Sequence, residues 1–220
     1  MQEAAPHKFS TTAQSAVLQA RGLGFHFPEQ ALFADFSLEL FPGVTLLRGG
    51  DGSGKTTLLR LLAGALPLQA GRLSIQGAAL QTAPAAYRKN VFWAEPRSQA
   101  FDPISALAYF QLQRSAYAAW DESVLDQLIA GLELAPQIEK PLYMLSTGSK
   151  RKVWLVAAFA SGAAVSLLDQ PFAALDKAST EFLLEQLAAV SQSPTGRAFL
   201  IADYAAPEAL ELAGLIDLAD

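Results

Sequence analysis

The stretch VTLLRGGDGSGKTTLLRLLAGAL, residues 44–66, decides the fold class of this 220-residue chain. The apolar VTLL indicates a short buried strand, and LLRLLAGAL, ending at about Leu66, is typical of a helix. Between them, GGDGSGKT fits the pattern G-x-x-x-x-G-K-[ST], whose backbone N–H groups surround phosphate groups. In this pattern Lys55 reaches the terminal phosphates of a nucleotide, and the Thr56 hydroxyl is placed for Mg²⁺. The predicted phosphate loop consists of Gly49, Gly50, Asp51, Gly52, Ser53, Gly54, Lys55, Thr56 and Thr57.

A second apolar run, VSLLDQP at residues 165–171, indicates another buried strand and contains an acid, Asp169, at its end. An acid in this place, together with a phosphate loop, is positioned to hold magnesium through water. The next residue, Gln170, can donate and accept hydrogen bonds but takes no proton from water at neutral pH. We therefore expect a site that binds a nucleotide and Mg²⁺ but has no obvious base at this position.

The rest of the chain alternates predicted strands with predicted helices, which is typical of an α/β fold with a mostly parallel sheet. Further strands are predicted at residues 36–40, 73–75, 90–93, 198–201 and 215–218, and helices at residues 177–190 and 207–213. From about residue 101 to residue 150 the pattern is helical, with Asp121 as the cap of one helix. We expect this region to be a small helical subdomain inserted between strands.

The composition narrows the class of protein. With 51% hydrophobic residues, the chain can bury a large core, and we expect one domain over residues 17–220 after a flexible, polar tail at residues 1–16. The net charge of −5 argues against a nucleic-acid partner, and the lack of cysteine excludes disulfides and thiolate metal sites. The longest uncharged run, residues 153–168, is shorter than the roughly 20 residues needed to cross a bilayer.

The order of several motifs resembles that of the ATP-binding subunits of ATP-binding cassette (ABC) transporters. After the phosphate loop come LSTGSKRK at residues 145–152, in place of the family's LSGGQ signature, then VSLLDQP, and then AALD at residues 173–176. A phosphate loop alone would leave kinases and GTPases open, whereas the ordered set favours the ABC family. The resemblance covers about residues 17–218 and implies a P-loop NTPase fold of ABC type, with a mostly parallel sheet, an antiparallel β portion and the inserted helical subdomain.

The resemblance also implies partners and binding residues. In this family two subunits face each other, and each ATP lies between one subunit's phosphate loop and the other's signature. We therefore expect a second ABC subunit as one partner. We also expect a membrane permease, which would dock on the helical subdomain and on the loop after Glu95. Ser146 and Gly148 would bind the partner's γ-phosphate from the start of a helix. Phe27 lies where the family stacks an aromatic residue on adenine, although its alternation with Phe25 is equally typical of a core position.

Three positions depart from the family pattern. Gln170 replaces the catalytic glutamate, and Asp203 stands where a histidine usually contacts the γ-phosphate. A carboxylate about 5 Å from a phosphate oxygen is repelled by roughly 3 kcal/mol at an effective dielectric of about 20, so Asp203 has to turn away, be protonated or pair with a cation. Glu95 falls nearest the family's magnesium-contacting glutamine and is either a metal ligand or a solvated loop carboxylate, with Gln99 as the alternative if the register shifts.

These departures predict a subunit that binds Mg-ATP and hydrolyses it weakly or not at all at its own site, where Lys55, Gln170 and Asp203 are the catalytic positions. Loss of a positioned base typically costs about a hundred- to ten-thousandfold in rate, while the loop and the metal preserve binding. Gln170 and Asp203 act on this chain's own nucleotide, whereas the nearly intact Ser146 and Gly148 act on the partner's nucleotide. This asymmetry favours a heterodimer over a homodimer. We expect a cytoplasmic protein held at the inner face of the membrane by its permease. The alternatives are a working ATPase with Asp203 as base and a soluble ABC-type regulatory switch without a permease.

Overall fold

The computed structural model describes residues 15–95, 98–193, 195–205, 207 and 210–218. The strands are β1 (Leu18–Phe27), β2 (Gln30–Leu40), β3 (Gly43–Arg48), β4 (Ala70–Ile75), β5 (Ala78–Ala79), β6 (Val91–Trp93), β7 (Val165–Asp169), β8 (Ala198–Asp203) and β9 (Gly214–Asp217). The helices are α1 (Lys55–Leu62), α2 (Pro84–Lys89), α3 (Ala106–Ala116), α4 (Glu122–Gly131), α5 (Thr147–Ala160) and α6 (Lys177–Gln192), with short 3-10 turns at Ala135–Gln137 and Leu142–Met144.

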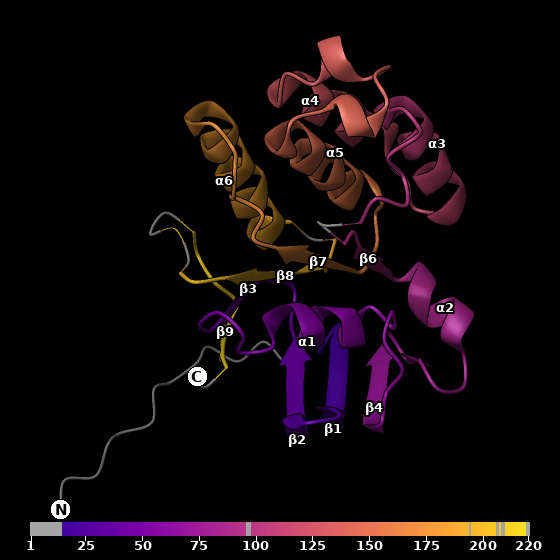
Figure 1. Ribbon diagram of the computed structural model, residues 1–220, viewed down its shortest axis with the longest axis vertical. Helices are drawn as coiled ribbons and strands as arrows, with labels where there is room; N and C mark the ends of the chain where they lie inside the picture. Colours follow the sequence, from indigo (N-terminus) through magenta and orange to yellow (C-terminus); the bar gives the residue numbers. More distant parts are fainter. Residues whose placement is uncertain (1–14, 96–97, 194, 206, 208–209, 219–220) are drawn as a thin grey trace, which may run out of the picture.

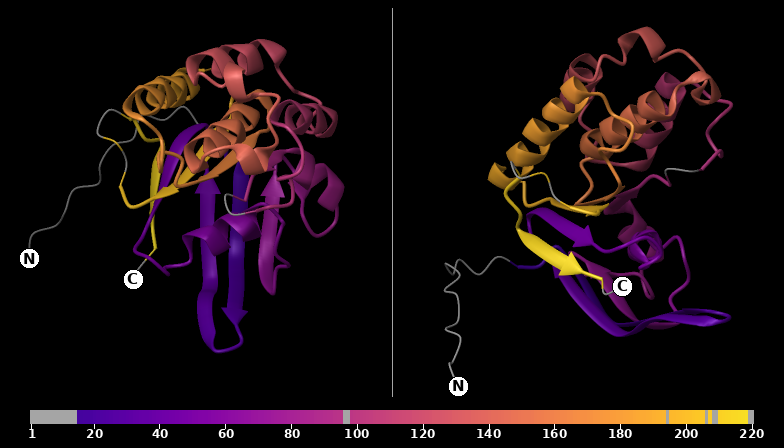
Figure 2. Two further views of the ribbon diagram at one scale, coloured as in Figure 1. Left: turned by 45° about the horizontal axis from the view of Figure 1, so that its top comes forward. Right: turned by 60° about the vertical axis from the view of Figure 1, so that its left-hand side comes forward.

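The strands form two sheets of different kinds. One is antiparallel with the order β2-β1-β4-β5, and the other is parallel with the order β6-β7-β8-β3-β9. Helices α5 and α6 cover one face of the parallel sheet, with α3 and α4 beyond them, while α1 and the antiparallel sheet lie on its other face (Figures 1 and 2). This arrangement confirms the predicted α/β class with a mostly parallel sheet and an antiparallel portion.

Burial on both faces of the parallel sheet explains its continuous apolar runs. Along β8, Phe199 and Ile201 pack into the core shared with α5 and α6, whereas Leu200 packs into the core shared with α1. The same alternation divides β7, where Leu167 and Leu168 belong to opposite cores. Both faces of these central strands are therefore covered.

The last turn of α5 is fixed to the parallel sheet by Arg197, the residue before β8. Its guanidinium donates to the carbonyls of Ala158 (2.9 Å), Phe159 (2.8 Å) and Ala163 (2.8 Å). Burial lowers the pKa of Arg197 to about 10. The side chain therefore satisfies the carbonyls that a helix leaves unpaired at its end, and it holds α5 in register with β8.

Two sequence expectations differ from the structure. The helix predicted at residues 207–213 is wrong, because the described residues 207 and 210–213 are not helical and the Ala213 N–H instead bonds the carbonyl of Val44 at 2.7 Å, leading the chain into β9. Helix α1 ends at Leu62 instead of about Leu66, since Gly64 adopts φ 66° and turns the chain. The predicted tail at residues 1–16 lies almost entirely outside the described residues. Over the part of the chain that is described, no helix has the length and apolar character to cross a bilayer.

Candidate functional site

A cavity of about 520 Å³ opens at the edge where the neighbouring strands β3, β7 and β8 all end. Such an edge is the usual ligand-binding place in parallel α/β sheets. The lining combines the phosphate loop with residues from the strand ends and from α5: Asp51, Gly52, Gly54, Lys55, Thr56, Thr57, Glu95, Thr147, Arg151, Asp169 and Gln170. The fold thus brings together residues that the sequence motifs placed more than a hundred positions apart.

The phosphate loop has the form of an anion-binding concavity. Gly54 adopts φ 96°, which favours glycine, and a Cβ at Gly49 would lie 2.4 Å from Ser53 Oγ. Lys55 is buried, and its Nζ donates to the carbonyls of Gly49 (2.6 Å) and Gly50 (2.7 Å). The Ser53 hydroxyl oxygen is buried and has no hydrogen-bond partner among the described residues. An ammonium, an unpaired hydroxyl and the N-terminus of α1 suit the charge and acceptor oxygens of a phosphate chain.

The two predicted magnesium ligands are in contact. Thr56 Oγ1 donates to Asp169 Oδ2 at 2.7 Å, although the residues are 113 positions apart. The described residues contain no group of three or more His, Cys, Asp or Glu side chains that could hold a metal ion by themselves. Magnesium usually takes one or two carboxylates and completes its coordination with phosphates and water. Thr56 and Asp169 therefore fit a metal that is bound together with a nucleotide.

Glu95 lies in the wall of this cavity, whereas Gln99 lines a different one. Glu95 Oε1 is 3.7 Å from Arg60 Nε, and both side chains are partly exposed. Gln99 lies with Asp102 and Tyr143 around a separate cavity of about 270 Å³. The position of Glu95 favours it over Gln99 as the counterpart of the family's magnesium-contacting glutamine, and its role as a ligand stays a prediction.

Gln170 and Asp203 are neighbours across the ends of β7 and β8. The Gln170 N–H donates to the carbonyl of Ala202 at 2.8 Å, and Gln170 has φ 48°, a left-handed conformation that is uncommon outside glycine. Asp203 is partly buried, and its Oδ1 accepts the Tyr204 N–H at 2.8 Å. Burial raises the pKa of Asp203, the Tyr204 N–H lowers it, and the charge of Asp169 raises it again. Strand β8 therefore ends in an acid, Asp203, at the position next to Gln170, the amide that follows β7.

Tyr204, which no motif singled out, closes over the phosphate loop. Its hydroxyl hydrogen-bonds the Asp51 carboxylate, and its ring centroid lies 4.9 Å from Lys55 Nζ. This distance is within the range of a cation–π interaction. The hydrogen bond to Asp51 raises the pKa of Tyr204. The signal available in the sequence was an aromatic residue directly after Asp203, at a strand end.

Arg151 is a second residue to which the sequence analysis gave no role, although it lies in the stretch LSTGSKRK, whose last four residues, SKRK, form a small basic cluster. Its Nη1 donates to the carbonyl of Asp169 at 3.2 Å and to the carbonyl of Gln170. Burial lowers the pKa of Arg151, while the charges of Asp169 and Asp203 raise it. Arg151 therefore joins helix α5 to the end of β7, which carries the predicted metal ligand Asp169.

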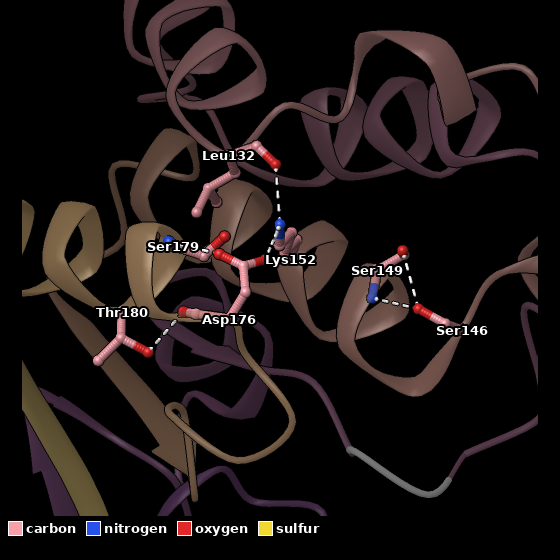
Figure 3. A network of polar contacts seen from close by, with 7 residues as sticks. All are labelled: Leu132, Ser146, Ser149, Lys152, Asp176, Ser179 and Thr180. Carbon is pink, nitrogen blue, oxygen red and sulfur yellow. Dashed lines mark hydrogen bonds and ion pairs between the residues drawn. The ribbon is translucent and has the colours of Figure 1, made fainter.

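The altered signature begins helix α5 (Figure 3). Ser146 Oγ accepts the Ser149 N–H at 3.1 Å and so caps the helix. A Cβ at Gly148 would lie 2.3 Å from the carbonyl oxygen of Ala174, so the AALD loop leaves room for glycine alone. Both residues predicted to face a partner's nucleotide thus also have structural contacts within this chain.

Lys152 ties the signature helix to the AALD loop, as Figure 3 shows. Its Nζ donates to Asp176 Oδ2 at 3.0 Å and to the carbonyl of Leu132 at 3.2 Å. Asp176 also caps α6 by accepting the Ser179 N–H at 2.8 Å. The bond from the Ser179 N–H, followed by the contact with Lys152, lowers the pKa of Asp176. Asp176, at the end of the loop after β7, is consequently bonded both to α5, through Lys152, and to α6, through Ser179.

Phe27 lies outside the core, and Phe25 lies within it. The Phe27 side chain is 45% exposed, whereas Phe25 is buried, and their rings meet edge to face at 5.1 Å between centroids. The hairpin that carries Phe27 contacts the phosphate loop, because a Cβ at Gly54 would lie 3.0 Å from Leu32 of β2. Exposure removes the core interpretation of Phe27, and its contact with adenine stays a prediction.

Comparison with known proteins agrees with the motifs. A family model described as ABC transporter matches residues 33–173. The cytochrome c biogenesis ATP-binding export protein CcmA of Rhodospirillum rubrum is 35% identical over 201 residues, which cover 85% of this chain and 86% of that protein. The taurine import ATP-binding protein TauB of Pseudomonas entomophila is 33% identical over 189 residues, covering 84% of this chain and 73% of that protein.

A solved structure described as the ATP-binding subunit of an ABC transporter has the same fold. It aligns with a TM-score of 0.76 at 22% identity, over 86% of this chain and 79% of that one. The family match spans more than half of the chain, and it includes the phosphate loop and the strand that ends in Asp169. The chain therefore belongs to the ABC transporter family and has the fold of its ATP-binding subunits.

Proposed function

We propose that this chain binds Mg-ATP in a dimer of facing subunits, couples binding to a membrane permease, and hydrolyses ATP weakly or not at all at its own site. One observation carries the proposal. The 2.7 Å contact between Thr56 and Asp169 assembles the metal-binding side of the cavity, whereas an amide, Gln170, follows Asp169 in the catalytic position. The cavity thus keeps the groups that bind the metal and the nucleotide, whereas the residue that usually acts as the base is replaced by Gln170.

Nucleotide binding is assigned to the loop and to the ends of β3 and β7. Lys55 exchanges the carbonyls of Gly49 and Gly50 for the terminal phosphates, and the Ser53 hydroxyl gains a partner. Thr56 and Asp169 hold Mg²⁺, which neutralises part of the phosphate charge when it is bound. These interactions require no proton transfer, so they persist without a catalytic base.

Hydrolysis requires a group that accepts a proton from the attacking water. The Gln170 side chain can orient water through hydrogen bonds, but its amide has no basic site at neutral pH. Replacing a positioned carboxylate by an amide is expected to slow turnover by about a hundred- to ten-thousandfold. Lys55, Gln170 and Asp203 therefore remain the proposed catalytic positions of a site whose main role is binding.

The partner subunit is proposed to be a different ABC chain. Ser146 and Gly148 are retained at the start of α5, where the family uses these positions on the other subunit's nucleotide. Gln170 and Asp203 affect only this chain's own nucleotide. In a heterodimer the altered site would hold the dimer together while the second site turns over, whereas a homodimer would contain two altered sites.

Coupling to a permease is assigned to a groove between the end of β6 and helix α3. The groove has a volume of about 250 Å³, and aromatic side chains of Trp93, Phe101 and Tyr109 line it. Glu95 lines both this groove and the nucleotide cavity, so it lies between the two sites. We place the chain in the cytoplasm, on the inner face of the membrane. CcmA and TauB are named for export and import respectively, so they leave the direction open.

The proposal is tested by titrating the purified chain with ATP in a calorimeter, with Mg²⁺ and with the metal chelated. We expect tight binding that weakens without Mg²⁺, and Asp169→Asn should remove most of that metal dependence. In a separate experiment, the complex isolated from its native source with this chain should contain a second ABC subunit and a permease. Absence of Mg-ATP binding would overturn the assigned function, and a complex without a membrane protein would favour the regulatory switch.

A working ATPase with Asp203 as its base is the second candidate. It is favoured by the position of Asp203 beside Gln170 and by the burial that raises the pKa of this carboxyl, which makes it more basic. In that case the purified chain would turn over steadily, Asp203→Asn would abolish turnover, and Gln170→Ala would leave it in place. If the main proposal holds, the unmodified chain shows little turnover and neither change matters.

A further inference from the structure

The chain makes a sharp turn directly after the proposed metal ligand. Asp169 is the last residue of β7, and its Oδ2 accepts a hydrogen bond from Thr56 Oγ1 at 2.7 Å. Gln170 follows with φ 48°, in the left-handed region that residues other than glycine seldom adopt. A residue keeps such a conformation only when the surrounding structure holds it there. The contacts of this turn therefore bear on where the Asp169 carboxylate lies.

Two peptide groups flank the Cα of Gln170, one shared with Asp169 and one with Pro171. In the first, the N–H donates to the carbonyl of Ala202 at 2.8 Å, and the carbonyl accepts from Arg151 Nη1 at 3.2 Å. The second has no N–H, since proline lacks one, and its carbonyl also accepts from Arg151 Nη1. Arg151 therefore holds both peptide groups, and with them the backbone conformation of Gln170.

The guanidinium of Arg151 is suited to holding this turn. It is carried by α5, whose far end is fixed to the parallel sheet by Arg197. A guanidinium stays charged in proteins, and hydrogen bonds from a charged donor are stronger than those between neutral groups. Among the described residues, no carboxylate forms an ion pair with Arg151 and its Nε has no hydrogen-bond partner, so its hydrogen bonds all go to these two carbonyls.

We propose that Arg151 is a positioning residue, which holds the turn at Asp169 and Gln170 in the conformation that binds the magnesium of Mg-ATP. The inference rests on the proposed function, since the metal belongs to the same nucleotide. The first peptide group that Arg151 holds is attached to the Cα of Asp169, so its release lets the carboxylate turn away from Thr56. The loss then falls on the part of ATP binding that depends on the metal.

The test measures the dissociation constant of the full chain for ATP, once with Mg²⁺ and once with the metal chelated. The ratio of the two constants reports the metal-dependent part of binding alone. Arg151→Met keeps an apolar stem but removes the donors, and it should reduce this ratio by about tenfold, as the loss of an outer partner of a metal ligand typically does. Arg151→Lys keeps a charged donor and should retain most of the ratio. Thermal melts show whether each variant is folded.

Two controls separate positioning from a merely structural role. Lys152→Met removes the next cation along α5, which bonds Asp176 at the other end of the same loop, and should change the ratio by less than about twofold. In the Asp169→Asn background, Arg151→Met should also change the ratio by less than about twofold, because the ligand through which Arg151 acts is gone.

An unchanged ratio in Arg151→Met, or an equal reduction in Lys152→Met, would overturn the inference and leave Arg151 with a structural role only. If Arg151→Met does not fold, Arg151→Gln, whose side chain is shorter, replaces it and is judged by the same reduction of the ratio. A natural chain that binds no Mg-ATP would instead refute the proposed function. The two failures are therefore distinguishable.

Discussion

The two walls of the nucleotide cavity differ in how much of the family pattern they keep. On the phosphate-loop wall, residues 49–57 retain the whole motif, and Thr56 reaches Asp169 as the motif requires. At the strand ends, Gln170 and Asp203 stand where the family resemblance leads us to expect a glutamate and a histidine. Binding depends on backbone N–H groups, a lysine and a metal, whereas turnover depends on one positioned base. A chain can therefore lose the second function and keep the first.

The largest expected effect comes from restoring the strand-end wall. Gln170→Glu combined with Asp203→His should raise the hydrolysis rate of the assembled dimer by about a hundred- to ten-thousandfold, because a carboxylate base returns and the second acid leaves. Phosphate release measures the effect, and Gln170→Ala with Asp203→His is the matched control. A pair of variants with equal rates would show that the base position is not what limits turnover.

The phosphate-loop wall is broken by Lys55→Ala. Loss of the buried ammonium removes charge-assisted hydrogen bonds, so the affinity for Mg-ATP should fall by about 2–4 kcal/mol, or about thirtyfold to a thousandfold. Gln170→Ala is the control, and it should leave affinity within about threefold. An equilibrium titration with Mg-ATP measures both affinities. If Lys55→Ala and Gln170→Ala weaken binding equally, binding does not depend mainly on the phosphate-loop wall.

Gly148→Ala probes the start of α5, which we propose faces the partner subunit. The added Cβ would lie 2.3 Å from the Ala174 carbonyl oxygen, and overpacking of this kind costs about 1–3 kcal/mol of unfolding free energy. Denaturant titration measures this loss, and Thr147→Ala, at an exposed neighbour, should change stability by less than about 0.5 kcal/mol. Unchanged stability of Gly148→Ala would contradict the close contact between the signature and the AALD loop.

The smallest expected effect concerns Asp176. Its pKa is lowered in the folded chain, by the Ser179 N–H first, so its ionisation adds stability at pH values above the unfolded pKa of about 4, and this stability is lost as the pH falls toward the folded pKa. Asp176→Asn keeps a capping oxygen but loses the charge opposite Lys152. The thermal midpoint should therefore drop slightly at pH 7, with a difference that shrinks below about pH 4. A difference that is constant across this range would exclude the charge as its cause.

The sequence predicted the binding wall better than the strand-end wall, for a physical reason. A phosphate loop is a local motif, because its glycines, Lys55 and Thr56 act within one turn of chain. The contacts of Arg151 and Tyr204 depend instead on how distant segments pack, and the sequence offered only a basic cluster and an aromatic neighbour of Asp203. Their positions therefore became clear only from the structure.

The same distinction applies to the fold. Strand β7 was predicted because burial on both faces leaves a continuous apolar run. Strand β1 was not among the predicted strands, since Gly22 and Gly24 interrupt its pattern and its pairing with β2 contains irregular register. The false helix at residues 207–213 had helical composition, but the bond from Ala213 to Val44 fixes its end along the sheet. Tertiary pairing overrode local preference in both segments.

The most direct measurement identifies the nucleotide that stays on the protein. The purified chain is incubated with radiolabelled Mg-ATP, separated from free nucleotide at successive times, and its bound label is resolved into ATP and ADP. Because the loop binds and Gln170 accepts no proton, the bound label should remain ATP far longer than in the variant with Gln170→Glu and Asp203→His. Bound ADP appearing as fast in the natural chain as in that variant, or no bound label at all, would contradict a site that binds without efficient turnover.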